Sequence, residues 1–589
     1  MTATLKTTLR MAVAALSLSC YLALGAQAQQ TARQADYHVV PLPQSIVMDD
    51  GGRPFALSSR TAMRVVCTDD SQRPAMNRNA AFLQAYIEER TRLQIAIDTD
   101  ATTVATAATA TAATAFAAVD TEATAAPDVI TLTLDAGIPH DEGYRIAVEE
   151  HSVTVAGRTA AGVFHAIQTL RKSLPALAET MEGQETGVGQ VWLPAVVITD
   201  APRFRWRGMM LDCVRHFFPL DFVKRYIDIL ALHNMNVFHW HLTDDQGWRI
   251  EIKSCPELTQ IGAWRDGTVV GNNSDVDDAT PHGGYYTQDE AREIIAYAAE
   301  RHITVVPEFE MPGHTKAFLA SYPDLGCTGG PYRVGHHWGV YNDVLCIGNS
   351  DLYPRLQQVL DELMDLFSAP YIHVGGDETP TTRWDHCPKC QAVALDEGET
   401  LQGHFTQWVE AYVNAKGKKM IGWDEVLATG APATATIMAW RGIQAGVEAA
   451  EAGHDVIMAP LTHCYFDYIQ TSNRYYEPSS TGSPTDVAQV YSLEPVPDSL
   501  SIEAKSHILG VQANLWCEYV TLPATAEYMV LPRAAALSEV QWTDPSERDY
   551  EQFLTRLDRL VRIYDEQGWQ YALHLWPERT PQKRWMIDN

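Results

Sequence analysis

Two adjacent carboxylates, Asp377 and Glu378, are the residues of this sequence best placed for acid–base chemistry. Residues 371–374 predict a short buried strand, and Gly375 and Gly376 after it permit backbone angles that a β-carbon forbids. Two carboxylates held close together cannot both ionise freely, so one pKa rises, which is one way to keep a proton donor protonated. The alternative is a surface pair in a turn. The apolar strand before the pair and the aromatic segments after it favour an active site.

Length and charge narrow the class of protein. The chain has 589 residues, too many for one ordinary core, so we expect two or more domains. The formal net charge of −30 argues against binding to nucleic acid or to anionic membranes. Beyond the first residues, no apolar run approaches the ~20 residues of a membrane helix, so we expect no membrane insertion.

The first 28 residues predict a signal peptide. Lys6 and Arg10 form its basic end, an apolar segment follows, and residues 26–28 read Ala-Gln-Ala, a typical cleavage site. Cys20 raises the alternative of a lipoprotein, but Ser17 stands where an aliphatic residue is required. We therefore expect an exported protein, periplasmic or secreted.

The cysteines allow more than one interpretation. Cys327 and Cys346 bracket a glycine-rich, aromatic loop that a disulfide would staple, and Cys387 and Cys390 form a C-x-x-C. A redox or zinc site is an alternative, but no second C-x-x-C completes a metal site. Because export permits disulfides, we predict local loop staples.

Residues 36–200 predict a smaller α/β domain. Within it, residues 101–126 are almost only Ala and Thr, without an apolar stripe, and we interpret them as an inserted loop with no role in the chemistry. The predicted elements are a strand at 129–134, a hairpin at 144–149 and 152–156, and a helix at 160–170.

From residue 203 to residue 545 the pattern is strand, loop and helix, repeated. A capping box of Thr287 and Glu290 begins one of the helices. Eight such units predict a closed (β/α)8 TIM barrel, with an open doubly wound sheet as the alternative. Residues 546–589 are expected to form a C-terminal helical extension. The predicted strands are 208–211, 237–241, 304–307, 371–374, 419–422, 436–439, 455–459 and 508–512.

Polar and aromatic side chains directly follow these strands, which favours the barrel because catalytic groups lie at the C-terminal ends of barrel strands. Indole faces stack on sugars, while carboxylates and arginine bind hydroxyls, so the set predicts a carbohydrate site. For any single tryptophan, core packing is the alternative. In chain order the residues are Asp212 and Arg215; His241 and Asp244; Glu308 and His314; Asp377 and Glu378; Trp423, Asp424 and Glu425; Trp440 and Arg441; Tyr465 and Asp467; Trp516 and Glu518.

Two other functions fit parts of the pattern. His239 and His241 point to the same side of a strand, and with Asp244, His314 and Asp377 they would make the metal site of a metal-dependent hydrolase. Such a site has no obvious use for the indoles. A non-catalytic sugar-binding protein would use the indoles but would not need the adjacent carboxylates.

The sequence His-Val-Gly-Gly-Asp-Glu at 373–378 is similar to the signature of the family 20 glycoside hydrolases, the β-N-acetylhexosaminidases. The resemblance runs from about residue 203 to residue 542, and the preceding domain resembles the family's N-terminal domain. Cys517 departs from the family pattern, where Thr is commoner. Supporting segments are 211–217, 239–249, 311–314, 422–425 and 440–442.

The resemblance implies an exo-acting enzyme that removes terminal N-acetyl-β-D-hexosamine from an oligosaccharide or glycoconjugate. Glu378 would be the general acid and then the base, while the substrate's own 2-acetamido oxygen would act as nucleophile. Asp377 would orient the acetamido N–H, and Tyr465 would bind the acetamido oxygen.

The same resemblance implies the remaining roles and no cofactor or metal. Asp244 and His314 would form a relay behind Glu378. The choice between GlcNAc and GalNAc, the linkage and the oligomeric state stay open. The residues expected to bind the sugar are Trp423, Trp440, Trp516, Arg215, Asp467 and Glu518.

Overall fold

The computed structural model describes residues 33–99, 128–177, 191–272, 274–474, 477–480 and 482–577. The chain divides into two compact units, Met1–Ala201 with Thr555–Ile563, and Pro202–Leu554 with Tyr564–Asn589. The predicted signal peptide and the Ala/Thr-rich insertion at 101–126 lie outside the described residues. None of the helices in the described ranges combines the length and the apolar character needed to cross a membrane.

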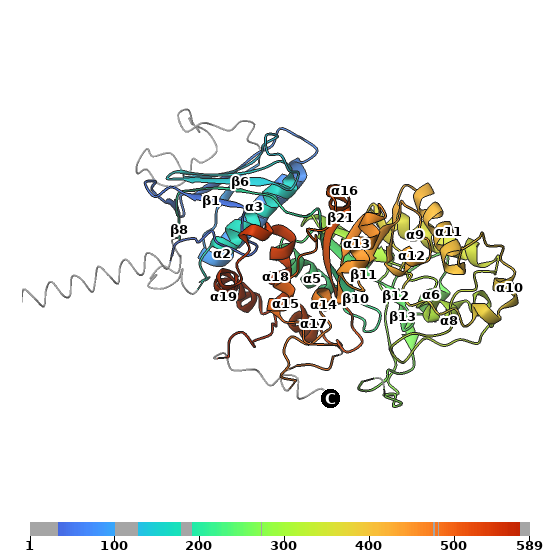
Figure 1. The fold of residues 1–589 in the computed structure, drawn as a ribbon. Coiled ribbons are helices and arrows are strands. Elements are labelled where there is room, and N and C mark those ends of the chain that lie inside the picture. The colour runs from blue at the N-terminus through green and yellow to red at the C-terminus, as the bar shows by residue number, and fades with distance from the viewer. Residues whose placement is uncertain are drawn as a thin grey trace, which may run out of the picture. The chain divides into compact units, whose positions relative to one another are not determined.

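A sheet and two helices form the first unit (Figure 1). Its elements are β1 Ser45–Met48, β2 Phe55–Leu57, β3 Ala62–Val66, α2 Arg73–Thr91, β4 Ala96–Asp98, β5 Val129–Leu134, β6 Tyr144–Glu149, β7 Ser152–Gly157, α3 Ala160–Ser173, β8 Val191–Leu193 and β9 Val196–Asp200. The described strands have the order β1-β9-β6-β7-β5-β3-β4, with β2 and β8 as a separate pair, and α3 packs on α2 and β7. The predicted strand, hairpin and helix are confirmed as β5, β6 with β7, and α3.

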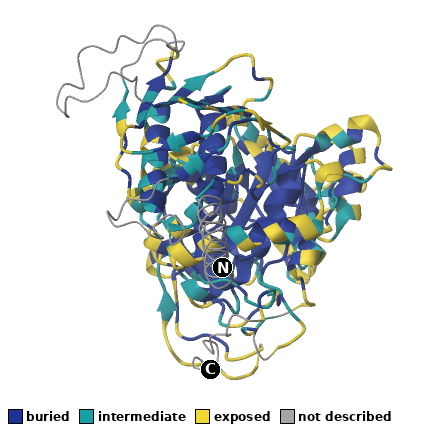
Figure 2. Ribbon diagram, turned by 90° about the vertical axis from the view of Figure 1, so that its left-hand side faces the viewer, coloured by how far each residue is buried: buried dark blue, intermediate teal, exposed yellow. Residues whose placement is uncertain are grey.

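The second unit is a closed barrel of parallel strands, which confirms the predicted TIM barrel and excludes the open sheet. Its strands are β10 Trp206–Asp212, β11 Val237–His241, β16 Thr304–Glu308, β17 Tyr371–His373, β18 Lys419–Trp423, β19 Thr436–Ala439, β20 Val456–Met458 and β21 Ile508–Leu515. They pair in chain order, and β21 closes the barrel against β10. Figure 2 shows these strands buried, with exposed residues on the surrounding helices and loops.

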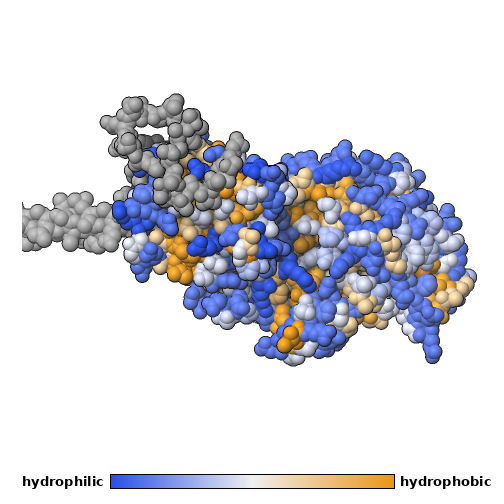
Figure 3. Space-filling model, turned by 90° about the horizontal axis from the view of Figure 1, so that it is seen from above, coloured by the Kyte–Doolittle hydropathy of each residue, from blue (hydrophilic) through white to orange (hydrophobic). Residues whose placement is uncertain are grey.

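The second unit also contains the helices that connect its strands and those that follow β21, except that Thr555–Ile563 of the last helix belong to the first unit. The predicted capping box is present at the start of α7, where Thr287 and Glu290 bond each other's backbone. In the views drawn, the surface is mostly hydrophilic, with apolar side chains in separate small patches (Figure 3). The helices are α5 Leu220–Leu232, α6 Glu257–Gln260, α7 Gln288–Ala299, α8 Lys316–Ser321, α9 Leu352–Leu366, α10 Pro388–Gln391, α11 Leu401–Ala415, α12 Glu425–Ala428, α13 Ile443–Glu451, α14 Leu461–Cys464, α15 Val487–Tyr491, α16 Ile502–His507, α17 Pro523–Val530, α18 Arg533–Trp542 and α19 Tyr550–Gln567. Small paired strands in the connections are β12 Thr243–Asp244, β13 Gly247–Trp248, β14 Trp264–Arg265 and β15 His282–Gly283.

Strand register brings four polar side chains to one level of the barrel. Asp212 lies beside His241, His241 beside Glu308, and Glu308 beside His373. Residues paired in this way on neighbouring parallel strands share a face of the sheet. An apolar cluster that includes Val306, Ile421, Met438 and Ile457 packs in the interior of the barrel unit.

The two glycines after β17 have the conformations that the sequence predicted. Gly375 has φ +68° and Gly376 has φ +98°. A β-carbon on Gly375 would lie 1.7 Å from Glu310 Oε2, and one on Gly376 would lie 2.6 Å from Val426 Cγ1. Close packing as well as backbone angle therefore requires glycine at both positions.

We expect Gly375→Ala to destabilise the barrel more than Gly417→Ala. Both glycines have positive φ, but a β-carbon on Gly417 would meet no atom within 4 Å. Left-handed backbone costs an L-residue roughly 1–2 kcal/mol, and only Gly375→Ala adds the collision with Glu310. Equilibrium unfolding in urea measures both. Equal losses for the two variants would show that the collision is relieved at no cost.

Candidate functional site

The turn after β17 holds Glu378 in an uncommon conformation. Glu378 has φ 46°, and His314, which faces it from the loop after β16, has φ 49°. Non-glycine residues in this region cost of order 1–3 kcal/mol and persist only where their surroundings enforce them. The strain thus falls on the two residues predicted to act as acid and relay. The side chain of Glu378 is 42% exposed, whereas that of Asp377 is 14% exposed.

His314 lies between two pairs of carboxylates. Its Nδ1 is 3.2 Å from Asp244 Oδ1 and 3.0 Å from Asp245 Oδ2. Its Nε2 is 3.7 Å from Asp377 Oδ2 and 3.5 Å from Glu378 Oε2. Burial alone would lower the pKa of His314, but Asp244 and Asp377 raise it well above its ordinary value. At neutral pH the ring is therefore a buried cation.

Arg215 joins this group from the loop after β10. Its guanidinium lies 2.8 Å from Asp244 Oδ2 and 3.2 Å from Asp212 Oδ2, and Nε donates to Gln246 Oε1 at 3.1 Å. Burial alone would raise the pKa of Asp244, but Arg215 and His314 hold it below its ordinary value. Arg215, Asp244 and His314 thus form a chain of alternating charge that leads to Asp377 and Glu378.

The two central carboxylates differ in proton affinity. Burial, with Glu308 and Glu378 nearby, raises the pKa of Asp377 to about 6, although His314 opposes the shift. The contact with His314 lowers the pKa of Glu378. One pKa of the pair does rise, as the sequence predicted, but in the free site it is that of Asp377. Asp377 Oδ1 is also buried without a hydrogen-bond partner among the described residues.

Four aromatic rings form one wall beside the carboxylates. The centroids of Trp440 and Tyr465 are 6.0 Å apart with nearly parallel planes. Trp516 lies 5.8 Å from Trp423 and 6.4 Å from Tyr465. Trp440 Nε1 donates to Glu425 Oε2 at 2.9 Å, which fixes the ring. The predicted indoles and the predicted tyrosine therefore converge on one place.

Glu518 lies near Arg215, and Asp467 lies near Glu518. Burial raises the pKa of Asp467 well above its ordinary value, and that of Glu518 above its own. Glu518 raises the pKa of Asp467 further, and Arg215 opposes the shift at Glu518. A cleft of about 700 Å3 begins beside Glu518, and its lining includes Trp338 and Tyr519. All six residues expected to bind the sugar belong to the barrel unit and follow its strands.

Sequence reasoning missed Glu310, a buried carboxyl behind Asp377. Burial, Asp377 and Glu308 raise the pKa of Glu310 well above its ordinary value, which favours its neutral form. Trp423 Nε1 donates to Glu310 Oε1 at 3.4 Å. A carboxyl three residues beyond the predicted end of a buried strand was the available signal.

The histidines of the metal alternative occupy two layers. His239 and His241 both contact Glu308, which confirms that they point to the same side of their strand, and His373 Nδ1 joins them at 2.8 Å. Burial lowers the pKa of His239 to about 4, whereas Glu308 and Asp244 outweigh burial and raise that of His241 to about 10. His314 belongs to the upper layer with Asp244 and Asp377. His241 connects the layers through its 3.1 Å contact with Asp244.

The fold and the site define a barrel enzyme with adjacent carboxylates beside an aromatic wall. The family model described as "Glycosyl hydrolase family 20, catalytic domain" matches residues 204–545, and the model for domain 2 of that family matches residues 36–201. The chain belongs to glycosyl hydrolase family 20.

Known proteins support this assignment. A Porphyromonas gingivalis "Beta-hexosaminidase" is 39% identical over 77% of this chain and 57% of its own length. A Vibrio furnissii "Beta-hexosaminidase" is 40% identical over 68% of this chain and 65% of its own length. The chain thus spans less than two thirds of these relatives. A Vibrio harveyi exo β-N-acetylglucosaminidase in complex with N-acetylglucosamine has 30% identity and a TM-score of 0.74, covering 92% of this chain and 79% of that one.

We expect His314→Ala to move the alkaline limb of kcat/KM to higher pH, besides lowering the rate. The single proton shared by Asp377 and Glu378 is lost as pH rises through about 6, the pKa of Asp377. Because the cation at His314 lowers the pKa of both carboxyls, its removal raises both. The measurement is the pH profile of hydrolysis of a chromogenic N-acetyl-β-D-glucosaminide.

A matched control is His507→Ala. His507 also faces an aspartate, with Nδ1 3.5 Å from Asp455 Oδ1, but it is the last residue of α16, directly before β21 begins and away from the strand ends that carry the site. The pH profile of kcat/KM for the His507→Ala variant should match that of the wild type. If the His314→Ala variant has the same pH dependence of kcat/KM as the wild type and differs only in a lower melting temperature, His314 is a structural residue.

Proposed function

We propose that the protein is an exo-acting β-N-acetylhexosaminidase that works by a retaining, substrate-assisted mechanism. The observation that carries the proposal is the buried Oδ1 of Asp377, which has no hydrogen-bond partner among the described residues and lies next to Glu378. A buried carboxylate oxygen without a donor is costly, and the N–H of a 2-acetamido group would satisfy it. The aromatic wall supports the same assignment, because a sugar and its methyl group bury well against indole faces.

The two carboxylates then divide the work. Asp377 binds the acetamido N–H and turns the acetamido oxygen toward the anomeric carbon, and Tyr465 donates to that oxygen. Glu378 protonates the glycosidic oxygen as the bond breaks, and an oxazolinium ion forms. Glu378 then removes a proton from the water that opens this ion. Two inversions at the anomeric carbon leave the β-configuration unchanged.

Substrate binding has to move a proton. In the free site the shared proton rests on Asp377, while the acid must be Glu378. An acetamido N–H bonded to Asp377 favours its charged form. A sugar that covers the partly exposed Glu378 removes water from it and favours its neutral form. Both effects transfer the proton to Glu378 only when the correct substrate is bound.

The substrate would be an oligosaccharide or glycoconjugate with a terminal N-acetylhexosamine, the sugar named for the Vibrio harveyi relative. The basic and apolar pattern of residues 1–28 supports export of the enzyme, to the periplasm or the medium, where such material is met. Fractionation of the producing cells, with activity followed in each fraction, tests this location.

We expect Glu378→Gln to remove nearly all turnover of substrates whose leaving group needs a proton. General acid catalysis is typically worth ~10²–10⁴-fold. A dinitrophenyl glycoside leaves without protonation, so its first step should be much less affected than that of a chitobiose-type substrate. Both substrates are measured on one preparation with an unchanged melting temperature. Equal loss on the two would remove Glu378 from the role of acid.

We also expect a β-glucoside and a 2-amino-glucoside with the same leaving group to react hardly at all at saturation. The first lacks the acetamido nitrogen and the second lacks the carbonyl oxygen. The loss of contacts in the acetamido pocket would cost roughly 1–3 kcal/mol of interaction free energy. A well-placed internal nucleophile reaches effective molarities of ~10⁵–10⁸ M, so kcat should fall much further.

Product stereochemistry completes this test. Proton NMR of the first product formed should show the β-anomer. Efficient turnover of the plain glucoside, or an inverted product, would overturn the substrate-assisted mechanism. Loss of activity on chelation, with the carboxylates intact and the melting temperature unchanged, would instead favour the metal-dependent alternative.

A further inference from the structure

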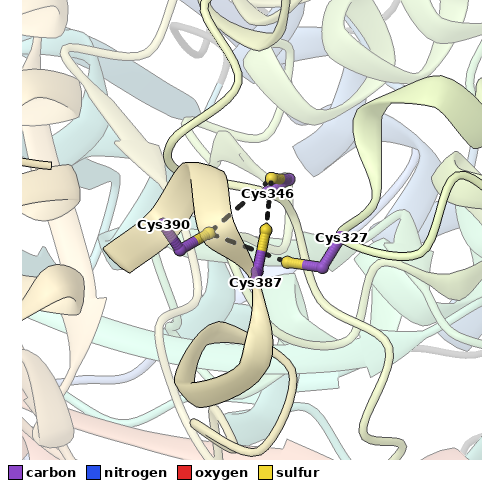
Figure 4. A group of neighbouring side chains, drawn as sticks. All are labelled: Cys327, Cys346, Cys387 and Cys390. Carbon is purple, nitrogen blue, oxygen red and sulfur yellow. Dashed lines mark hydrogen bonds between the residues drawn. The ribbon is translucent and has the colours of Figure 1, made fainter. Parts of the chain in front are cut away.

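Four cysteines from separate segments of the barrel unit converge on one point (Figure 4). Cys346 Sγ is 3.6 Å from Cys387 Sγ and 3.6 Å from Cys390 Sγ, and Cys390 Sγ is 3.7 Å from Cys327 Sγ. All four sulfurs lie within 4.8 Å of one another. Three of the side chains are buried and Cys327 is partly exposed.

Local structure brings the first two cysteines together. A bridge pairs Gly326 with Leu345 in antiparallel fashion, and the Cys346 N–H donates to Leu325 O at 2.9 Å. Cys327 and Cys346 therefore lie side by side, although 18 residues separate them in the chain. The sequence prediction that this pair closes its own loop captured the proximity, but not that Cys387 and Cys390 meet it.

The second two cysteines come from the loop after β17. Cys387 is the N-cap of the short helix α10, and Cys390 follows within it, so both sulfurs face the same side. Gly348 makes the approach possible, because a β-carbon there would lie 2.1 Å from Lys389 O.

We propose that Cys327, Cys346, Cys387 and Cys390 bind one structural Zn2+. Zinc binds four thiolates tetrahedrally at about 2.3 Å, which places the sulfurs about 3.8 Å apart, close to the spacings observed. Cys346 is equally distant from both cysteines of the C-x-x-C, whereas a disulfide selects one partner at about 2.0 Å. Four thiolates are the soft ligand set that selects zinc over calcium or magnesium.

The metal would join the two loops that carry the acid and its relay. Cys327 and Cys346 lie in the connection between β16 and α9, which also holds His314. Cys387 and Cys390 lie in the connection between β17 and α11, which begins with Asp377 and Glu378. Trp384 Nε1 donates to Leu345 O at 2.8 Å and Arg383 pairs with Asp343 at 2.8 Å, so the same two loops also meet beside the cluster. The site is structural, because no reacting group touches it.

Metal analysis of the mature chain tests the proposal. The protein is purified without chelator and without an affinity tag, and zinc is measured by plasma mass spectrometry together with the intact mass under native conditions. We expect about one zinc per chain. We expect the Cys387→Ser/Cys390→Ser variant to hold none, with a lower melting temperature that chelator does not lower further.

Cys67→Ser is the matched control. Cys67 is a buried cysteine of the first unit whose Sγ donates to Asp69 O at 3.1 Å, a bond that a serine hydroxyl also makes. This variant should keep its zinc. Cobalt added to the metal-free wild type should give the intense visible bands of a tetrahedral site and the near-ultraviolet charge-transfer bands of thiolate ligands. That spectrum distinguishes this cluster from the histidines and carboxylates near Glu378. The experiment uses only the wild-type chain, so its result does not depend on whether a variant folds.

Two results would overturn the proposal. One is a chain lighter by four hydrogens, with no thiol reactive after denaturation among these four cysteines, because that would show two disulfides. The other is a reduced chain that binds neither added zinc nor added cobalt with a thiolate spectrum. Neither result would bear on the glycosidase activity, which is measured separately.

Discussion

The imidazolium of His314 is the charge on which the arrangement of the site depends. It faces Asp244 and Asp245 through one nitrogen, and Asp377 and Glu378 through the other. Burying a single ion costs several kcal/mol, and the cost is offset only when opposite charges lie close on every side. Arg215, Asp244 and His314 therefore stand in alternating sign. Loss of one would leave its neighbours buried and uncompensated.

This alternation explains why the acid can be partly exposed. A carboxylic acid that donates a proton to substrate must meet the glycosidic oxygen, so Glu378 cannot be enclosed by protein in the free state. Its proton affinity is set from behind, by a group that is itself fixed by two aspartates. The bound sugar covers Glu378 and excludes water from it, so the reactive protonation state forms together with the complex.

How far the sequence predicted the structure depends on where polar residues stand. Apolar strands followed by polar side chains identified all eight barrel strands and most of the site. The prediction ended the last strand at residue 512, whereas β21 continues to Leu515. Gln512 and Asn514 are buried inside the barrel and bonded to each other, so polar residues that belong to the strand interior resembled its end. Glu308 is likewise the last residue of β16, whereas the prediction ended that strand at residue 307.

The cysteine cluster shows a different limit. Local patterns detect a C-x-x-C, but Cys327 and Cys346 reach it only through a backbone bridge and the close approach at Gly348. No spacing in the sequence records such a meeting of three segments. Tertiary contacts between loops, unlike strands and helices, carry no periodic signal.

The level of the barrel shared by Asp212, His241, Glu308 and His373 limits how this enzyme can change during evolution. Three imidazoles converge on the single carboxylate of Glu308, and all four side chains are buried. Replacing one partner alone leaves the others with unmatched charge, while replacing several together can restore the balance, so the energetic effects are far from additive. Laboratory selection by single substitutions will therefore find few tolerated changes in this layer. Libraries that vary all residues of the layer together are needed to change substrate specificity through the residues beneath the sugar.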